Sequence, residues 1–221
     1  MTDARASTAQ ILRRATLVGR ALRNDARATA AVEAALILPV ALTMFALLIY
    51  GAEAFAIQRK VTLTARTVTD LVTQAAPTQM SSGASLVSHS QSGDNPGIDT
   101  YLGVSSSVLT PYASANLSML ISEVQVNSDQ VTAVVQWSEP CPSSACPNNG
   151  LTARPLGQTI TLPTGLGTGQ AGSYFVLGEV AYNYTPLQIF TPATALTLHD
   201  AIYLTPRQST SISCTDCTTH S

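Results

Sequence analysis

The chain has 221 residues, which is enough for one ordinary domain and a membrane segment but not for two large domains. Its net charge of −2 argues against non-specific binding of nucleic acids, because contacts with phosphates need a surplus of cationic side chains. Only 11% of the residues are charged, against roughly 25% in soluble domains. This composition predicts a membrane segment, a sparsely charged exported domain, or both.

The first segment, residues 1–28, is basic. It holds six of the eleven lysines and arginines of the chain: Arg5, Arg13, Arg14, Arg20, Arg23 and Arg27. Because Arg59, Lys60 and Arg66 follow soon after the apolar run, the charge difference across that run is moderate. By the positive-inside rule we predict a cytoplasmic N-terminus, with residues 1–28 as a cytoplasmic basic leader.

A long apolar run, residues 34–57, follows the leader, with no charged residue between Glu33 and Glu53. About twenty such residues cross a hydrocarbon core of about 30 Å. A buried core helix of a soluble protein seldom has so long an uncharged run, and the core of a cleaved secretory signal is shorter, about 7–15 residues. Pro39 removes one backbone donor and can kink the helix. We therefore predict one transmembrane helix over residues 29–57.

The residues at the start of this run carry a resemblance. Arg27 and Ala28 precede four uncharged residues, then Glu33 and the apolar stretch, in the order ARATAAVEAALILPVAL. This segment resembles the start of the TadE-like minor pilins (pseudopilins) of tight-adherence pili, and more widely the processing site of type IV prepilins. The resemblance implies cleavage after Ala28 by a prepilin peptidase, so that Thr29 becomes the first residue of the mature chain. Ala28 stands where the family usually has Gly, and Ala34 stands where an aromatic residue is usual.

Glu33 has two simpler explanations besides the pilin one. A carboxylate at the start of a helix is favoured by the helix dipole, and it can also mark the polar boundary of the span. The resemblance implies a further role, in which Glu33 pairs with the N-terminal amine of a neighbouring subunit in an apolar filament core. Removing one partner of such a buried pair costs about 3–5 kcal/mol. We therefore expect Glu33 to set the axial register of the subunit in the assembly.

Residues 58–76 contain neither Gly nor Pro, so the helical pattern continues beyond the span. Apolar side chains recur there at intervals of three and four residues, with Leu71 beside them: Val61, Ala65, Val68, Val72 and Ala75. This spacing predicts a helical stalk with one apolar face. Pro77 and the Ser- and Gly-rich stretch after it predict a flexible linker over residues 77–99.

Residues 100–221 predict an exported α+β domain. A short helix is expected first, then a β-hairpin of two alternating segments, then two further β-rich segments: residues 100–113, 117–127 with 131–138, 174–185, and 201–213. About four antiparallel strands with a helix over one face form an α+β layer arrangement. The predicted fold is therefore pilin-like, with a long N-terminal helix packed on a small antiparallel sheet. The motifs Val-x-Trp-Ser at 135–138 and Glu-Val-x-Tyr-x-Tyr-x-Pro at 179–186 also resemble TadE-like proteins.

All four cysteines follow the apolar run: Cys141, Cys146, Cys214 and Cys217. Their position fits an oxidising compartment outside the membrane. Of the three possible pairings we favour local bridges, 141–146 and 214–217, over crossed bridges that would each close about 70 residues. A Cys₄ zinc site and a thioredoxin-like role for the last two cysteines are weaker interpretations, because oxidation competes with zinc and no βαβ pattern surrounds them.

The sequence contains no convincing catalytic or cofactor-binding motif. Residues 167–172 match G-x-G-x-x-G, but a strand-like segment follows them and no acid lies at the required distance, so we interpret them as a flexible loop. The histidines lack metal-ligand spacing, and the aspartate beside one of them has no nucleophile-elbow serine to work with: His89, His199, Asp200 and His220. We expect no enzymatic activity, no cofactor and no bound metal.

Together, these features predict a structural or assembly subunit of a tight-adherence pilus. We expect a single-pass protein of the inner membrane, with its N-terminus in the cytoplasm and its C-terminal domain in the periplasm or outside the cell. The expected partners are the membrane, other pilin or pseudopilin subunits, the pilus assembly platform and the prepilin peptidase, and no nucleic acid. Two alternatives stay open, a pseudopilin of a secretion system and an uncut single-pass envelope receptor or binding protein.

Overall fold

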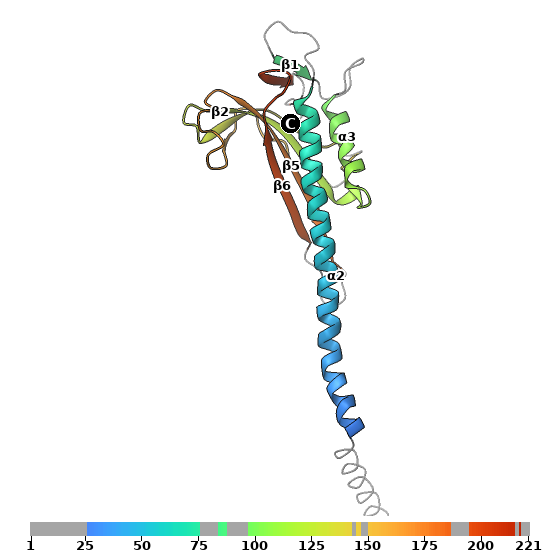
Figure 1. Cartoon of the computed structure of the whole chain (residues 1–221). Coiled ribbons are helices and arrows are strands. Elements are labelled where there is room, and N and C mark those ends of the chain that lie inside the picture. Colours follow the sequence, from blue (N-terminus) through green and yellow to red (C-terminus); the bar gives the residue numbers. More distant parts are fainter. Residues whose placement is uncertain are drawn as a thin grey trace, which may run out of the picture. The chain divides into compact units, whose positions relative to one another are not determined.

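The structure is a computed structural model that describes residues 26–75, 84–87, 97–142, 145–146, 150–186, 195–214 and 217. The predicted leader up to residue 25 and most of the predicted linker lie outside these residues. The chain divides between Ala52 and Glu53 into two compact units. The described part of the first unit is helical, and the described strands all belong to the second (Figure 1).

Helices and strands follow one another in the order α2 (Ala26–Thr73), β1 (Ala84–Val87), α3 (Ile98–Leu109), the 3₁₀-helix η1 (Ser114–Asn116), β2 (Leu117–Val126), β3 (Thr132–Pro140), β4 (Thr159–Thr161), β5 (Tyr174–Tyr184), β6 (Leu196–Leu204) and β7 (Ser211–Cys214). The main sheet has five strands in the order β4-β3-β2-β5-β6, and every neighbouring pair is antiparallel. β1 and β7 form a separate parallel pair. A long helix with a small antiparallel sheet confirms the predicted α+β, pilin-like fold class.

Within the second unit, α2 packs one face on the sheet. The residues of the predicted apolar face are all buried, with exposed fractions of at most 3%: Val61, Ala65, Val68, Val72 and Ala75. They share a core with alternate residues of the two central strands: Leu117, Met119 and Ile121 of β2, and Val176, Val180 and Tyr182 of β5. The predicted apolar face is therefore confirmed, although the helix ends at Thr73 rather than at residue 76.

α2 approaches the sheet closely at Gly178 of β5. A Cβ atom at this position would lie 1.8 Å from Thr69 Oγ1 and 3.1 Å from Thr69 Cβ. Thr69 is fully buried, and its hydroxyl donates a hydrogen bond of 2.6 Å to the carbonyl of Ala65, so its side chain has little freedom to move aside. Only glycine fits at this position.

α3 lies beside α2 (Figure 1) and contributes to the same core. Its buried residues follow helical spacing: Ile98, Leu102, Ser105 and Leu109. The helix is shorter at its C-terminal end than the predicted 100–113, because the residue before Pro111 disfavours the helical conformation. Lys60 of α2 donates a hydrogen bond of 3.2 Å from Nζ to the carbonyl of Val108, one of the carbonyls that a helix end leaves unpaired.

Part of the chain between β3 and β5 packs against the opposite face of the sheet. A second, smaller core lies there and includes Leu162 from this connection: Val124, Val126, Ala133, Val135 and Phe175 are its other members. The glycines of residues 167–172 belong to this layer and contact the turn between β2 and β3. The sequence pattern does not predict this contact. The amide of Gly169 donates a hydrogen bond of 2.9 Å to the side-chain oxygen of Gln130. Gly167 packs so closely on the Gln130 carbonyl that a Cβ would lie 2.3 Å from its oxygen.

The β-rich segment predicted over residues 201–213 contains parts of two strands, β6 and β7, which belong to different sheets. β6 ends at Leu204, and Pro206 lacks the amide that a ladder needs. The amide of Arg207 instead donates a hydrogen bond of 2.9 Å to the carbonyl of Thr73, and its guanidinium pairs with Asp70. The chain thus leaves the main sheet after β6 and supplies a hydrogen-bond donor to the C-terminal end of α2. It then forms β7. The short strands β1 and β4 are further elements that the sequence does not predict.

Replacing Gly178 with alanine should lower the free energy of unfolding by about 1–3 kcal/mol, because the new Cβ overlaps the Thr69 side chain. Urea unfolding of the full chain in mild detergent measures this. Gly103→Ala is the matched control, since a Cβ at Gly103 meets nothing within 4 Å and alanine favours the α3 helix. Equal losses in the two variants would contradict the close-packing explanation.

Candidate functional site

The described part of the first unit presents an apolar surface along α2. Its large apolar side chains are all at least 50% exposed: Val32, Leu36, Ile37, Leu38, Val40, Leu42, Met44, Phe45, Leu47, Leu48 and Ile49. The most apolar 18-residue window of this helix has a mean hydropathy of 2.4, and none of it is buried. Among the described residues, α2 is the one helix long and apolar enough to cross a membrane. An exposed apolar surface of this extent is typical of contact with lipid or with other protein.

The predicted processing and register residues lie near the N-terminal end of α2. The backbone of Ala28 is helical, and Thr29 and Glu33 are both exposed on the helix. Positions four residues apart lie on the same face of a helix, so Thr29 and Glu33 share one side of it. In the part of the chain that the structure describes, Glu33 has no ion-pair partner. Its carboxylate is thus open to a cation brought by another molecule.

Polar side chains tie α2 to the folded domain around the end of the apolar run. Tyr184 of β5 donates a hydrogen bond of 2.9 Å from its hydroxyl to Glu53 Oε2. Gln58 donates one of 3.3 Å from Nε2 to the carbonyl of His199 in β6. With the bond from Lys60 to α3, three neighbouring elements hold this segment of the helix. The carboxylate of Glu53 is therefore hydrogen-bonded within the folded domain.

The cysteines form two local disulfides, Cys141–Cys146 and Cys214–Cys217, which is the pairing that the sequence favoured. The first closes the loop after β3 and shares the core under α3, where Cys146 Sγ lies 3.9 Å from the hydroxyl of Ser105. The second follows directly on β7. Both disulfides therefore fasten ends of strands, and neither links the two distant segments of the chain.

A buried carboxyl group holds β7 to the main sheet. Glu123 of β2 is 2% exposed and accepts a hydrogen bond of 2.6 Å from the amide of Ile212. Trp137 of β3 donates from its indole nitrogen to the carbonyl of the same residue. Burial raises the pKa of Glu123 to about 7, against the lowering effect of its hydrogen bonds with Ile212 and Trp137. A mostly polar cavity of about 230 Å³ adjoins this group, and Tyr174 is among its lining residues.

The alternation pattern of β2 contains a signal for the buried carboxyl group of Glu123, although we did not use it for a prediction. Glu123 occupies the same phase of β2 as Leu117, Met119 and Ile121, all of which face α2. An acid in phase with core positions predicts a buried carboxyl group. The partner strand β7 lies 89 residues later, and nothing in the sequence identifies it.

Because the pKa of Glu123 is higher when folded than when unfolded, its contribution to stability is full below about pH 4.5 and is lost as the pH rises through about 7. We expect the free energy of unfolding of the full chain to fall by an amount of the order of 3 kcal/mol between these limits. Glu123→Gln, which cannot ionise, should flatten the profile between pH 5 and 8. Denaturant titrations at several pH values measure this.

Asp129→Asn is the matched control for this prediction. Asp129 is fully exposed, and hydrogen bonds from Thr132 and Val131 lower its pKa, so it titrates well below pH 5. Its replacement should leave the slope between pH 5 and 8 unchanged. Parallel profiles for wild type and Glu123→Gln would show that the buried carboxyl group does not control the stability in this range.

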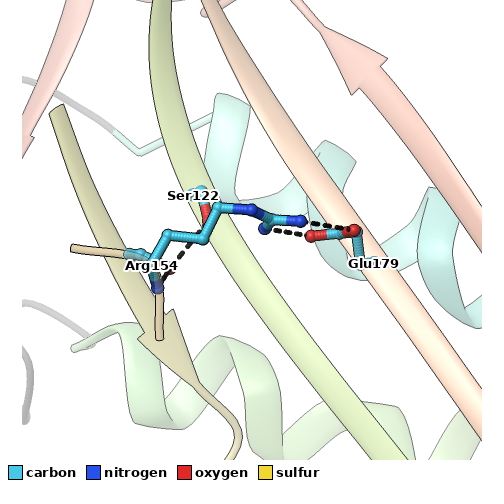
Figure 2. A network of polar contacts seen from close by, with 4 residues as sticks. Ser122, Arg154 and Glu179 are labelled. Atoms are coloured by element: carbon cyan, nitrogen blue, oxygen red, sulfur yellow. Dashed lines mark hydrogen bonds and ion pairs between the residues drawn. The ribbon is translucent and has the colours of Figure 1, made fainter. Parts of the chain in front are cut away.

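A second polar network lies on the opposite sheet face (Figure 2). Arg154, from the covering segment, forms a two-pronged ion pair with Glu179 of β5, and the hydrogen bond to this carboxylate raises the pKa of the guanidinium. The amide of Arg154 also donates a hydrogen bond of 3.0 Å to the hydroxyl of Ser138. The hydroxyl of Ser138 lies 2.8 Å from the hydroxyl of Ser122. Earlier in the same segment, the amide of Gly150 donates a hydrogen bond of 2.7 Å to the hydroxyl of Ser118. These contacts attach the covering segment to the sheet.

Replacing Arg154 with methionine should lower the free energy of unfolding by about 3 kcal/mol, because Glu179 would remain largely buried without its cation. Adding Glu179→Gln to this variant should restore most of the loss, since the second change removes the unpaired charge. Thermal and urea unfolding of the single and double variants measure the coupling. If the two losses simply add, the pair does not act as a buried unit.

The remaining predicted candidates do not converge on one place. His199 is exposed on β6 next to Asp200, and His89 and His220 lie outside the described residues. Within the described ranges, no group of three or more His, Cys, Asp or Glu side chains could hold a metal ion. The exposed apolar part of α2, with its two ends, is therefore the main candidate for a functional surface.

Comparison of the chain with protein families, with curated proteins and with solved structures gives no match. The resemblance of residues 27–40 to TadE-like pilins therefore supports a proposed function only.

Proposed function

We propose that this chain is a structural subunit of a pilin-like assembly, specifically a TadE-like minor pilin or pseudopilin of a tight-adherence pilus. The observation that carries the proposal is that α2 has two segments with different surroundings. Between residues 29 and 52 its apolar side chains are uncovered, whereas between residues 57 and 72 the same helix is buried against an antiparallel sheet. A helix with one half free for lipid or other helices and one half fixed in a domain suits a subunit that is first anchored and then assembled.

The placement of charge supports the same proposal. The leader is rich in arginine, the exposed run has no charge between Glu33 and Glu53, and the second of these acids is engaged by Tyr184. Of these two acids, Glu33 is the one that has no ion-pair partner among the described residues and can therefore act between subunits. We propose that it pairs with the N-terminal amine of a neighbour, which would be created by cleavage after Ala28. This arrangement supports the proposed location in the inner membrane, with the sheet domain exported.

The two disulfides favour an exported domain, since such bonds persist in oxidising compartments, and the low content of charged residues, 11%, agrees with this. The proposed partners are other pilin or pseudopilin subunits, the assembly platform, the prepilin peptidase and the membrane. No catalytic role is proposed. A secretion-system pseudopilin would share all these features, and an envelope receptor would share the anchor without the cleavage.

The mature N-terminus of the native protein tests the processing step. We expect Thr29 as the first residue when the chain is purified from cells that contain a prepilin peptidase, and the uncut leader in cells that lack it. Mass spectrometry of the intact protein distinguishes the two forms by the mass of residues 1–28. An N-terminus at Met1 or Thr2 in both strains would favour a permanent anchor and an envelope receptor.

Replacing Glu33 with glutamine should reduce incorporation into filaments or pilin complexes at least tenfold, because the amine of the neighbour would lose its carboxylate in an apolar setting. Co-sedimentation of the chain with sheared filaments, or its recovery in cross-linked complexes, measures this. Insertion into the membrane should be unchanged, as measured by resistance to alkaline extraction.

Glu53→Gln is the matched control, because it removes the same charge from the same helix at a position where Tyr184 supplies the partner. We expect it to alter the stability of the domain but not the assembly. Wild-type levels of assembly in Glu33→Gln would exclude the register role, even if the chain remains a membrane protein.

A further inference from the structure

An exposed aromatic and an arginine lie together on α2 close to the end of the apolar run. The guanidinium carbon of Arg59 lies 5.2 Å from the centre of the Phe55 ring, within the range of a cation–π contact. Phe55 is 64% exposed, and Arg59 is exposed as well. The two residues are one helical turn apart and point away from the buried side of the helix, which Ile57 and Val61 occupy.

The pair forms part of a shallow apolar groove. The groove has a volume of about 320 Å³ and is lined by Phe55, Gln58, Arg59, Thr62 and Leu63. The side-chain amide of Gln58 is already bonded to the His199 carbonyl, which leaves the guanidinium as the charged group at the groove. An apolar trough with one cation fits an amphipathic ligand that has an apolar tail and an anionic head.

The neighbouring cations are not equivalent to Arg59. Lys60 donates to the carbonyl of Val108 and is only partly exposed. Arg66 is exposed but lies about 10 Å further along the helix, at 1.5 Å per residue, beside a different cavity that also contains Asp70 and Arg207. Among the described residues, Arg59 has no carboxylate partner, so its planar set of donors can bind a phosphate.

We propose that Phe55 and Arg59 form an anchor for a phospholipid, with the guanidinium bound to the lipid phosphate and the ring against the upper part of the acyl chains. The order along the helix supports this occupant. Phe55 still belongs to the apolar run, and Arg59 follows about 6 Å later, which matches the step from hydrocarbon to headgroup at a bilayer surface. The proposal rests on the membrane span of the proposed function, and it adds a lipid contact that fixes how deep the helix sits.

The test uses the full chain reconstituted in phosphatidylcholine vesicles that contain about a quarter phosphatidylglycerol and a trace of a phosphatidylglycerol analogue photoreactive near its glycerol. After illumination, mass spectrometry measures the label on the peptide around residues 55–63. We expect strong labelling of the wild type and a loss of about fivefold in Arg59→Gln, as one cation near an anionic surface contributes about 1 kcal/mol. Phe55→Ala should also lower the labelling of this peptide.

Arg66→Gln is the matched control, since it removes the same charge from the same helix outside the groove. Its labelling should stay within twofold of wild type. Vesicle flotation of every variant separates the possible failures. A chain that floats but gives equal labelling in Arg59→Gln and Arg66→Gln overturns the lipid anchor and leaves the membrane span intact. A chain that does not float overturns both proposals. Loss of subunit cross-links in Arg59→Gln, with unchanged lipid labelling, would assign the groove to a neighbouring subunit and overturn the anchor.

Discussion

The fold depends on the close packing of α2 on the five-stranded sheet. Within this contact the buried Thr69 side chain lies against Gly178, and the absence of a Cβ there permits the close approach of the two layers. The apolar residues of the helix can then interdigitate with alternate residues of β2 and β5. Because the same helix is uncovered between residues 29 and 52, the sheet fixes one segment of a helix whose other segment needs a different, apolar environment.

Polar groups inside the domain decide how the rest of the chain is arranged around this contact. On the helix side of the sheet, the carboxyl group of Glu123 and the indole of Trp137 bind the backbone of Ile212 and thereby hold the C-terminal strand. On the other side, Arg154 and Glu179 fasten the long connection between β3 and β5. On each face of the sheet, a polar attachment thus helps to fix a segment that comes from a distant part of the chain.

Local patterns predicted much of this architecture. Spacings of three and four identify the buried face of α2, and alternation around a short turn identifies the hairpin of β2 and β3, because each pattern reflects contacts within one element. The carboxyl site of Glu123 and the split between β6 and β7 escape such reasoning. They depend on partners far away in the chain, such as Ile212, and on the bond from Arg207 to the end of α2. The three-residue strand β4 is too short to show a period at all.

The three polar ties near the end of the apolar run have a mechanical consequence. Glu53, Gln58 and Lys60 are bonded to β5, β6 and α3 respectively, within two turns of helix. Tension applied along this helix would be divided among three elements instead of falling on a single connection. β5 and β6 lie alongside α2 (Figure 1), and the hydrogen bonds of an antiparallel pair run across its strands. A pull along the strands therefore strains many of these bonds in shear at the same time, which resists rupture better than opening them one after another.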